Sequence, residues 1–507
     1  MTDMSVAPSV DLSLLPSLRR YLDHLSGDER RCALGRLAAL SPEDLLSFGA
    51  SEPQLVEHDY RVDEISGTLP DGLCGTLYRN GPGRWQDHTG RPLHHLFDGD
   101  GMLSAFTIGG GADGAGVRYR NRYVRTRHFQ GRTGVTHMGT AAPGGWRANI
   151  GRVPPNLANT GVVEHAGHLY ALWEAGPPHE IDPDTLETIG VRRFGGELRW
   201  LGSFSAHPCF CPSSGAMFNF GVELIPRPHL RIYHTDRTGR LRHFRSTPLP
   251  YPAMVHDFAL TERYLVFLVS PILPDAMAVL LGRAPIGDTL RYRPEKGSTF
   301  ILVPRDGGKI RRIDHAAILQ FHLSNAFDDG GDVVVDVITY GDACLLERIA
   351  RFQTSPLDDA PSVFTRFRIT ASGRVLTEPL SDNSCEFPRH HPAYEGRPHR
   401  YAYYNTRTRL CAFYDSVTKL DLTDRTERTY SSPEPGNSFC EPVFVPRPGA
   451  TAEDDGWLLT VEYRAAQQTS RLVVLDAADP SRGPVATAQL TSHLPQGFHG
   501  NFVARRR

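Results

Sequence analysis

The sequence predicts an all-β fold of the propeller type, and three observations support this prediction. Short stretches rich in valine, isoleucine, tyrosine and phenylalanine recur from about residue 52 onward, for example at 167–173, 264–269 and 333–338. Turn signals of similar composition separate them, such as those at 236–239 and 479–480. Few helical patterns interrupt the series over roughly 450 residues, and regular hairpins on that scale are typical of propeller blades. The repeat is too degenerate to give the number of blades.

The first 51 residues follow a helical pattern instead. Apolar side chains recur there at helical spacing, at Leu14, Leu15, Leu18, Tyr21, Leu22 and Leu25. Ser41, followed by a proline and two acidic residues, has the composition of a helix N-cap. We therefore expect two domains, a helical extension at 1–51 and a propeller at 52–507, with the extension packed on the propeller.

One segment of the propeller region, residues 271–290, departs from the strand pattern. It contains a short apolar helix candidate at 275–283. Two interpretations stay open for this helix. It can be an insertion packed on the protein, or it can dip into a membrane surface with Arg283 at the lipid headgroups.

Composition and charge exclude several classes of function. The formal net charge of the 507 residues is -2. The chain therefore lacks the excess of basic residues that would indicate binding of nucleic acid. The eight cysteines are scattered along a chain that is too large to need disulfides, which favours a reducing cytosol. The N-terminus lacks the apolar stretch of a signal peptide, and no apolar run reaches the roughly 20 residues of a spanning helix. We expect a cytoplasmic protein.

Four of the 22 histidines stand in apolar or aromatic surroundings, namely His207, His256, His322 and His499. A buried imidazole needs a partner for each of its two nitrogens. A metal ion on one nitrogen and a carboxylate on the other would satisfy both. Histidines so far apart in sequence share a metal only if the fold brings distant strands to one axis, as a propeller does.

Three glutamates lie in similar apolar surroundings, namely Glu174, Glu386 and Glu441. A buried carboxylate is costly unless it is compensated. Accepting a hydrogen bond from the Nδ1–H of a metal-binding histidine would compensate it and would also fix the histidine tautomer. The alternative is that each carboxylate caps a backbone turn.

Taken together, several short phrases resemble the carotenoid cleavage oxygenase family. They stand in the order of the family at 78–83, 96–102, 172–176, 386–388, 441–445 and 497–500. The resemblance begins at about Gly67 and continues to the C-terminus. It implies a seven-bladed propeller with one Fe(2+) per chain on its axis and with the four histidines named above as ligands.

The resemblance also implies roles for the residues around the iron. Glu174, Glu386 and Glu441 would be partners of His256, His322 and His499 respectively, and His207 would have no carboxylate partner. Thr160 falls where some family members narrow the access to an open iron position.

The implied reaction is the insertion of both atoms of O2 across a C=C bond of a conjugated chain, giving two carbonyl products. Four neutral imidazoles leave two positions of an octahedron for O2 and for solvent or substrate, and no organic cofactor is needed. We expect a dry tunnel lined by aromatic residues and leucines for an apolar carotenoid or apocarotenoid.

Two other functions remain open at this point. Stilbene-cleaving oxygenases of the same superfamily hold a phenolic oxygen with a tyrosine and a lysine. The lysine position corresponds here to Trp173, whereas Tyr123 could still fill the tyrosine role. A function of another class, a metal-free propeller that acts as a binding scaffold, predicts neither iron nor glutamate–histidine pairs.

Overall fold

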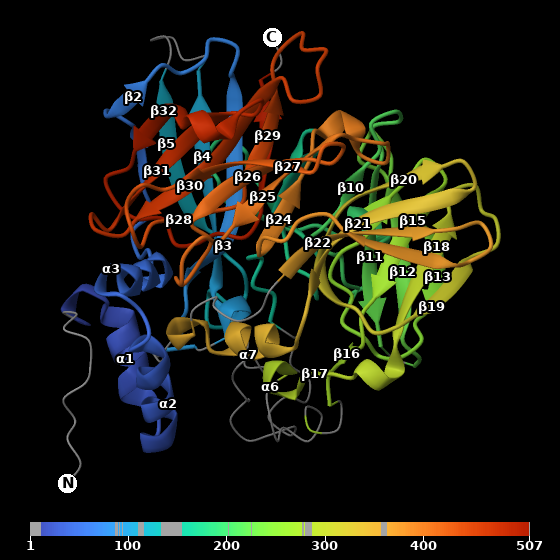
Figure 1. Cartoon of the computed structure of the whole chain (residues 1–507), viewed down its shortest axis with the longest axis horizontal. Coiled ribbons are helices and arrows are strands. Elements are labelled where there is room, and N and C mark those ends of the chain that lie inside the picture. The colour runs from blue at the N-terminus through green and yellow to red at the C-terminus, as the bar shows by residue number, and fades with distance from the viewer. Residues whose placement is uncertain are drawn as a thin grey trace.

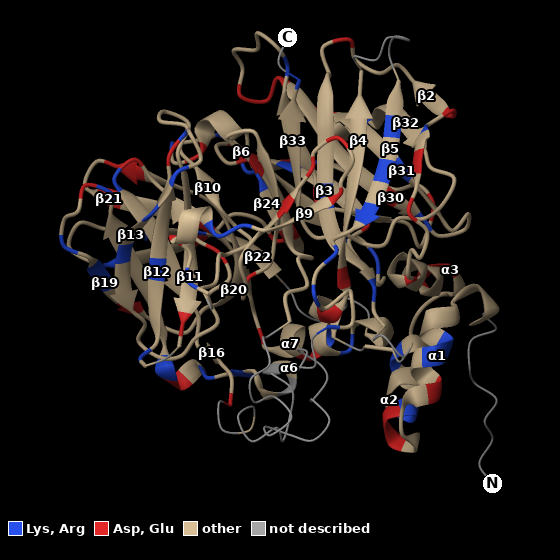
Figure 2. Ribbon diagram, turned by 180° about the vertical axis from the view of Figure 1, so that it is seen from behind, with Lys and Arg blue, Asp and Glu red and all other residues tan. Residues whose placement is uncertain are grey.

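The computed structural model describes residues 12–505 except 87–89, 91, 94, 110–115, 133–154, 201, 225, 276–277, 279–285 and 356–361. Seven β-sheets are arranged as the blades of a propeller, as predicted (Figure 1). Charged residues of both signs are spread over these blades (Figure 2). None of the helices among the described residues is long and apolar enough to cross a membrane.

The first four blades each contain four antiparallel strands in sequence order. Blade 1 comprises β6 (Gly161–His165), β7 (His168–Leu172), β8 (His179–Ile181) and β9 (Thr188–Val191). Blade 2 comprises β10 (Cys209–Phe210), β11 (Met217–Glu223), β12 (His229–Thr235) and β13 (Leu241–Pro248). Blade 3 comprises β14 (Ala259–Leu260), β15 (Tyr264–Val269), β18 (Ser298–Pro304) and β19 (Arg311–His315). Blade 4 comprises β20 (Leu319–Asp329), β21 (Asp332–Tyr340), β22 (Ser362–Ile369) and β23 (Val375–Pro379).

The last three blades close the ring. Blade 5 comprises β24 (Cys385–Arg389), β25 (Tyr401–Thr406), β26 (Ser416–Asp421) and β27 (Thr426–Ser431). Blade 6 comprises β28 (Ser438–Phe439), β29 (Val443–Pro446), β30 (Gly456–Arg464), β31 (Thr469–Asp476), β32 (Pro484–Gln489) and β2 (Ile65–Gly67). Blade 7 comprises β1 (Asp59–Arg61), β5 (Val117–Tyr123), β4 (Asp100–Ile108), β3 (Gly75–Arg84) and β33 (Gly500–Ala504). Both ends of the propeller chain enter this closure, because β2 pairs with β32 and β33 pairs with β3.

The hydrophobic core lies between neighbouring blades. Leu77 and Phe106 of blade 7, for example, belong to one buried cluster with Val461 and Leu472 of blade 6. Strands such as β15 and β21 are therefore buried on both faces, which explains why their sequences are nearly continuous apolar runs. The first strands of adjacent blades contact one another, so they line the central axis. Strand β14 contacts β20, for example, and β20 contacts β24.

The N-terminal segment forms η1 (Leu12–Leu14), α1 (Pro16–His24), α2 (Gly27–Leu37), α3 (Pro42–Leu45) and η2 (Leu46–Ser51). As expected from the sequence, the Ser41 side chain caps α3 by accepting a hydrogen bond from Asp44 N at 3.0 Å. Leu15 and Phe48 pack in one buried cluster with Ala412, which follows blade 5 strand β25. The division of the chain at residue 51 stays a prediction.

Short helices and one further strand pair make up the rest of the secondary structure among the described residues. The helices are η3 (Leu96–Asp98), η4 (Phe194–Gly196), α6 (Ile286–Thr289), η5 (Pro294–Lys296), α7 (Cys344–Ala350), η6 (Phe352–Thr354), η7 (Pro392–Tyr394) and η8 (Pro480–Arg482). Strands β16 (Ile272–Leu273) and β17 (Arg291–Tyr292) pair outside blade 3. Helices α6 and α7 lie at the same end of the blades as the N-terminal helices (Figures 1 and 2). The helix expected at 275–283 falls largely on residues outside the described ranges.

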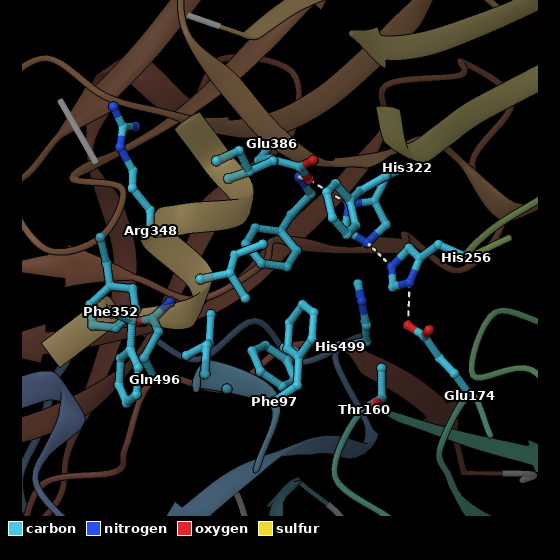
Figure 3. A pocket seen from close by; sticks show the side chains of 18 of the residues that line it. Phe97, Thr160, Glu174, His256, His322, Arg348, Phe352, Glu386, Gln496 and His499 are labelled. Atoms are coloured by element: carbon cyan, nitrogen blue, oxygen red, sulfur yellow. Dashed lines mark hydrogen bonds and ion pairs between the residues drawn. The ribbon is translucent and has the colours of Figure 1, made fainter. Parts of the chain in front are cut away.

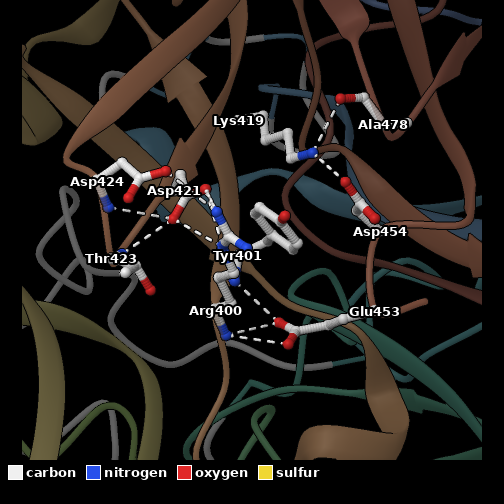
Figure 4. Close-up of polar contacts among 9 residues, drawn as sticks. All are labelled: Arg400, Tyr401, Lys419, Asp421, Thr423, Asp424, Glu453, Asp454 and Ala478. Carbon is white, nitrogen blue, oxygen red and sulfur yellow. Dashed lines mark hydrogen bonds and ion pairs between the residues drawn. The ribbon is translucent and has the colours of Figure 1, made fainter.

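Polar contacts join blades 5 and 6 (Figure 4). The backbone N–H groups of Arg400 and Tyr401 donate to the Glu453 carboxylate, each at 2.8 Å. Lys419 of β26 is nearly buried, and its Nζ lies 2.5 Å from Asp454 Oδ2. The same Nζ donates to the Ala478 carbonyl at 2.8 Å and lies 3.9 Å from the centre of the Tyr401 ring. The ammonium group is thus fully compensated at this junction.

Candidate metal centre and pocket

The four predicted histidines meet on the propeller axis. His322 lies in β20, and His207, His256 and His499 lie one to three residues before β10, β14 and β33. One ring nitrogen from each residue can be chosen so that all four lie within 4.8 Å of one another. The Nε2 atoms of His256 and His322 are 3.1 Å apart, and the ring centres of His207 and His499 are 4.5 Å apart.

The surroundings of these histidines fit a divalent metal ion. The buried Nε2 of His207 has no hydrogen-bond partner among the described residues. Burial lowers the pKa of His499 to about 4 and that of His207 well below its ordinary value, so both rings are neutral. Neutral nitrogen lone pairs that point at one another need a cation between them. Imidazole ligands suit zinc, copper, iron and nickel, so the donor set indicates a metal site without naming the metal.

Each predicted glutamate lies behind one histidine, on the nitrogen that faces away from the cluster. Glu386 Oε2 is 2.5 Å from His322 Nδ1, and Glu441 Oε1 is 2.9 Å from His499 Nδ1. Glu174 Oε1 contacts His256 Nδ1, and Figure 3 shows the contacts of Glu174 and Glu386. Because a carboxylate at Nδ1 holds a proton there, Nε2 keeps its lone pair for a metal.

Two side-chain partners of these carboxylates were not found from the sequence. The Tyr340 hydroxyl donates to Glu386 Oε1 at 2.5 Å. Arg389 Nη2 donates to Glu441 Oε2 at 2.8 Å, and Gly500 N–H donates to the same oxygen at 2.8 Å. Burial raises the pKa of Glu441, but Arg389 and His499 outweigh it, so the pKa lies well below its ordinary value. Arg389 follows the phrase at 386–388 directly, yet nothing local marks it as a partner.

Irregular backbone aims two of these side chains. The pairing of β20 with β21 shifts register on either side of Leu323, and that of β24 with β25 shifts between Glu386 and Arg389. Phe387 within the second bulge has a φ of 56°, a left-handed conformation that costs a bulky residue about 1–2 kcal/mol. The Phe387 N–H thereby donates to Glu386 Oε2 at 2.5 Å, and its ring centre lies 5.6 Å from that of His322. Such bulges are common beside functional sites.

An apolar pocket opens on the histidine cluster (Figure 3). Its empty space is about 1230 Å³, part of which is open to solvent. Its apolar lining includes Phe97, Met254, Phe321, Leu345, Phe352 and Phe498. Thr160 and Trp173 also line it, and Figure 3 shows Thr160 near His499. The pocket has the lining that was expected for an apolar substrate.

The position of Tyr123 does not fit the role of a ligand for a phenolic substrate, which the sequence had left open. It is not among the residues that line the pocket. Its hydroxyl donates to the Gln54 carbonyl at 2.7 Å, so this donor is already used within blade 7 and the segment before it.

A second, more polar cavity lies on the other side of the cluster. Its lining includes His207, Asp257, His322, Arg389 and Glu441. The rings of His322 and His499 border both cavities, whereas His256 borders only the apolar pocket. Burial raises the pKa of Asp257 to about 6. The histidine cluster therefore separates an apolar space from a polar one.

Comparisons with known proteins found similar sequences and similar structures. The model of the retinal pigment epithelial membrane protein family matches residues 51–504. The chain is 37% identical over 480 residues to the apocarotenoid-15,15'-oxygenase of Synechocystis sp., covering 91% of this chain and 96% of that protein. It is 30% identical to resveratrol cleavage oxygenase 1 of Aspergillus fumigatus, covering 90% and 95% of the two chains. The crystal structure of cobalt-substituted Synechocystis apocarotenoid oxygenase superimposes with a TM-score of 0.84 at 35% identity, covering 92% and 99%.

Proposed function

The chain belongs to the retinal pigment epithelial membrane protein family, among the carotenoid cleavage oxygenases, and from this premise we propose its reaction, its metal and its substrate. It is an oxygenase that cleaves a C=C bond of a carotenoid or apocarotenoid with O2. One double bond and one O2 give two aldehyde products, so atoms balance without a further reactant. The observation that carries this proposal is the apolar pocket that ends at four converging histidines.

We propose that one Fe(2+) per chain is held by His207, His256, His322 and His499. When bound, the iron supplies the activation of O2. These four imidazoles would be neutral ligands, so they would not compensate the charge of the ion. The nearest negative charges would be those of the three glutamates. These glutamates accept hydrogen bonds from the Nδ1–H groups and so keep the imidazole rings oriented.

The pocket walls orient the substrate and exclude water. A polyene offers the protein little besides apolar contact, which stabilises binding by about 0.8 kcal/mol per buried CH2-sized group. Aromatic and aliphatic side chains therefore select which double bond lies beside the metal. We propose that Thr160, which lines the pocket near His499, limits access to one open coordination position.

The pocket favours a polyene over a stilbene. Trp173 lines the pocket where stilbene-cleaving relatives carry a lysine, and the hydroxyl of Tyr123 is used by Gln54. The metal-free scaffold is disfavoured as well, because it gives no reason for four histidines to converge with a carboxylate behind three of them.

Peripheral membrane contact through 271–290 and a cytoplasmic location remain proposals. An apolar substrate dissolved in lipid gives such a contact a purpose. Replacing Val279, Leu280 and Leu281 by serine should lower the partitioning of the protein onto liposomes, and unchanged partitioning would refute the contact.

The function is tested by metal analysis together with product analysis. The purified protein should hold one iron per chain and convert an apocarotenal into two shorter aldehydes, with both atoms of labelled O2 in the products. His256→Ala should lose iron and activity, whereas His243→Ala, which alters an exposed histidine outside the site, should keep both. Iron retained at one per chain by His256→Ala would refute the ligand assignment. A protein that cleaves stilbenes but no carotenoid or apocarotenoid would refute the substrate class.

A further inference from the structure

The end of the apolar pocket that lies away from the histidines carries polar side chains. Figure 3 shows Arg348, Phe352 and Gln496 on the side opposite His256 and His322. Gln496 lines the pocket and is 5% exposed. Ser355 also lines the pocket, is 8% exposed and directly follows η6, the turn that carries Phe352. A pocket for a pure hydrocarbon has no need of polar groups at this end.

Gln496 is held in one orientation, in which no described residue donates to its carbonyl oxygen. Its Nε2 donates to the Phe439 carbonyl at 3.0 Å, and its backbone N–H donates to the Ala50 carbonyl at 2.8 Å. The Nε2 contact fixes which way the amide faces. No hydrogen bond from a described residue reaches Oε1 of Gln496. A carbonyl oxygen only accepts, so whatever satisfies it must bring a donor.

The Ser355 hydroxyl is the second polar group that lines this pocket without a partner among the described residues. It makes no hydrogen bond to any residue within the described ranges, and a hydroxyl both donates and accepts. The preceding residue, Thr354, is tied to α2, because Arg36 Nε donates to its carbonyl at 3.2 Å and Arg36 Nη2 lies 3.3 Å from its Oγ1. The N-terminal helices thus hold both sides of this end of the pocket, through Ala50 and through Arg36. Groups held in this way lose little freedom when a ligand binds.

We propose that the pocket recognises a polyene with a hydroxyl group at the end remote from the cleaved bond. This inference rests on the proposed function and narrows its substrate class. The substrate O–H donates to Gln496 Oε1, and Ser355 provides a second hydrogen bond at the same end. A substrate ending in a ketone or an ether has no hydrogen to donate to Gln496. A substrate ending in a hydrocarbon leaves a nearly buried acceptor without a partner, which is unfavourable.

The test compares three apocarotenals of equal length whose terminal ring carries a hydroxyl, a methoxy group or hydrogen. For the iron-loaded enzyme, kcat/KM for the hydroxyl substrate should exceed that for the other two by about fivefold, the equivalent of one net hydrogen bond. Gln496→Met should bring this ratio close to one. Gln353→Met is the matched control, because Gln353 is also buried and donates to a carbonyl (Leu93) but does not line the pocket. Its ratio should equal that of the unaltered enzyme.

The outcomes separate this inference from the proposed function. If none of the three substrates is cleaved, the proposed function fails. If they are cleaved with equal kcat/KM, or if the preference survives Gln496→Met, only the hydroxyl site is refuted. Should Gln496→Met unfold, Ser355→Ala gives the same test, since it should lower the ratio by about half or more while iron content and the unfolding midpoint stay the same. An unchanged ratio in Ser355→Ala would remove that residue from the site.

Discussion

Replacing Glu441 by glutamine should both destabilise the propeller and weaken the metal site. Glu441 is 2% exposed and accepts three hydrogen bonds, from His499 Nδ1, Gly500 N–H and Arg389 Nη2. Glutamine keeps the shape of the side chain but offers one carbonyl oxygen and an NH2 group. Since all three neighbours are donors, at least one of them then faces another donor.

The loss of stability follows from the charge of Arg389. Removing one partner of a buried ion pair costs about 3–5 kcal/mol. The side chain of Arg389 is 36% exposed, and it also donates to the Gly500 carbonyl at 2.9 Å, so solvent and this bond reduce the loss. We expect the free energy of unfolding to fall by about 2 kcal/mol. Loss of the His499 contact should weaken iron binding by about 10–100-fold.

Glu386→Gln is the matched control for this experiment. Glu386 also supports a histidine, but its other partners, the Tyr340 hydroxyl and the Phe387 N–H, are neutral. Urea unfolding of the metal-free proteins measures stability, and competition with a chelator measures iron affinity. Both variants should lose affinity, and Glu441→Gln should lose more stability. Equal stability of the two variants would refute the role given to Arg389, and unchanged iron affinity of Glu441→Gln would refute the role given to His499.

Three further predictions concern residues outside the metal centre. Burial lowers the pKa of His179 from 6.5 to about 4. The neutral ring therefore contributes about 3 kcal/mol to the free energy of unfolding above pH 6.5, and this contribution is lost as the pH falls to 4. The free energy of unfolding of His179→Gln, measured with urea, should depend less steeply on pH across this range, and an equal slope would contradict the prediction. Asp454→Asn leaves the ammonium of Lys419 without its carboxylate and should lower the free energy of unfolding by about 3 kcal/mol; a change below about 0.5 kcal/mol would show that the pair contributes as little as a surface pair. Arg36→Ala frees Thr354 and should raise KM about fivefold at unchanged iron content, whereas an unchanged KM would show that the N-terminal helices do not support the pocket.

Several parts of the site follow from local composition. The alternation of apolar strands and turns predicts the blades because each strand is buried between neighbours. The apolar neighbours of the four histidines and three glutamates mark them as buried groups that need partners. The assignment of each glutamate to its histidine and the number of blades came from the family resemblance, because no local pattern contains them.

Other parts depend on contacts between blades. Arg389 and Tyr340 are ordinary residues of strand ends in the sequence, and only the approach of blade 4 to blade 5 and of blade 5 to blade 6 gives them carboxylate partners. The interpretation of Tyr123 as a substrate ligand failed for the same reason, since the segment before blade 7 takes its hydroxyl. The bulges at Leu323 and Phe387 were also missed, because a shift of register is a property of two strands together.

The chemistry that is available here, imidazoles and carboxylates buried among apolar strands, follows from short stretches of sequence, because residue type and the apolar character of the neighbours are local properties. Which of these groups meet depends on how the blades are arranged around the axis. Closure of the ring through β33 and β2 carries His499 to the same axis as His207 and His256. The N-terminal helices pack on Ala412, which lines the pocket. Partners separated by dozens of residues are selected by the geometry of closure and by the cost of leaving a buried polar atom unpaired, and neither is visible in a short stretch of chain.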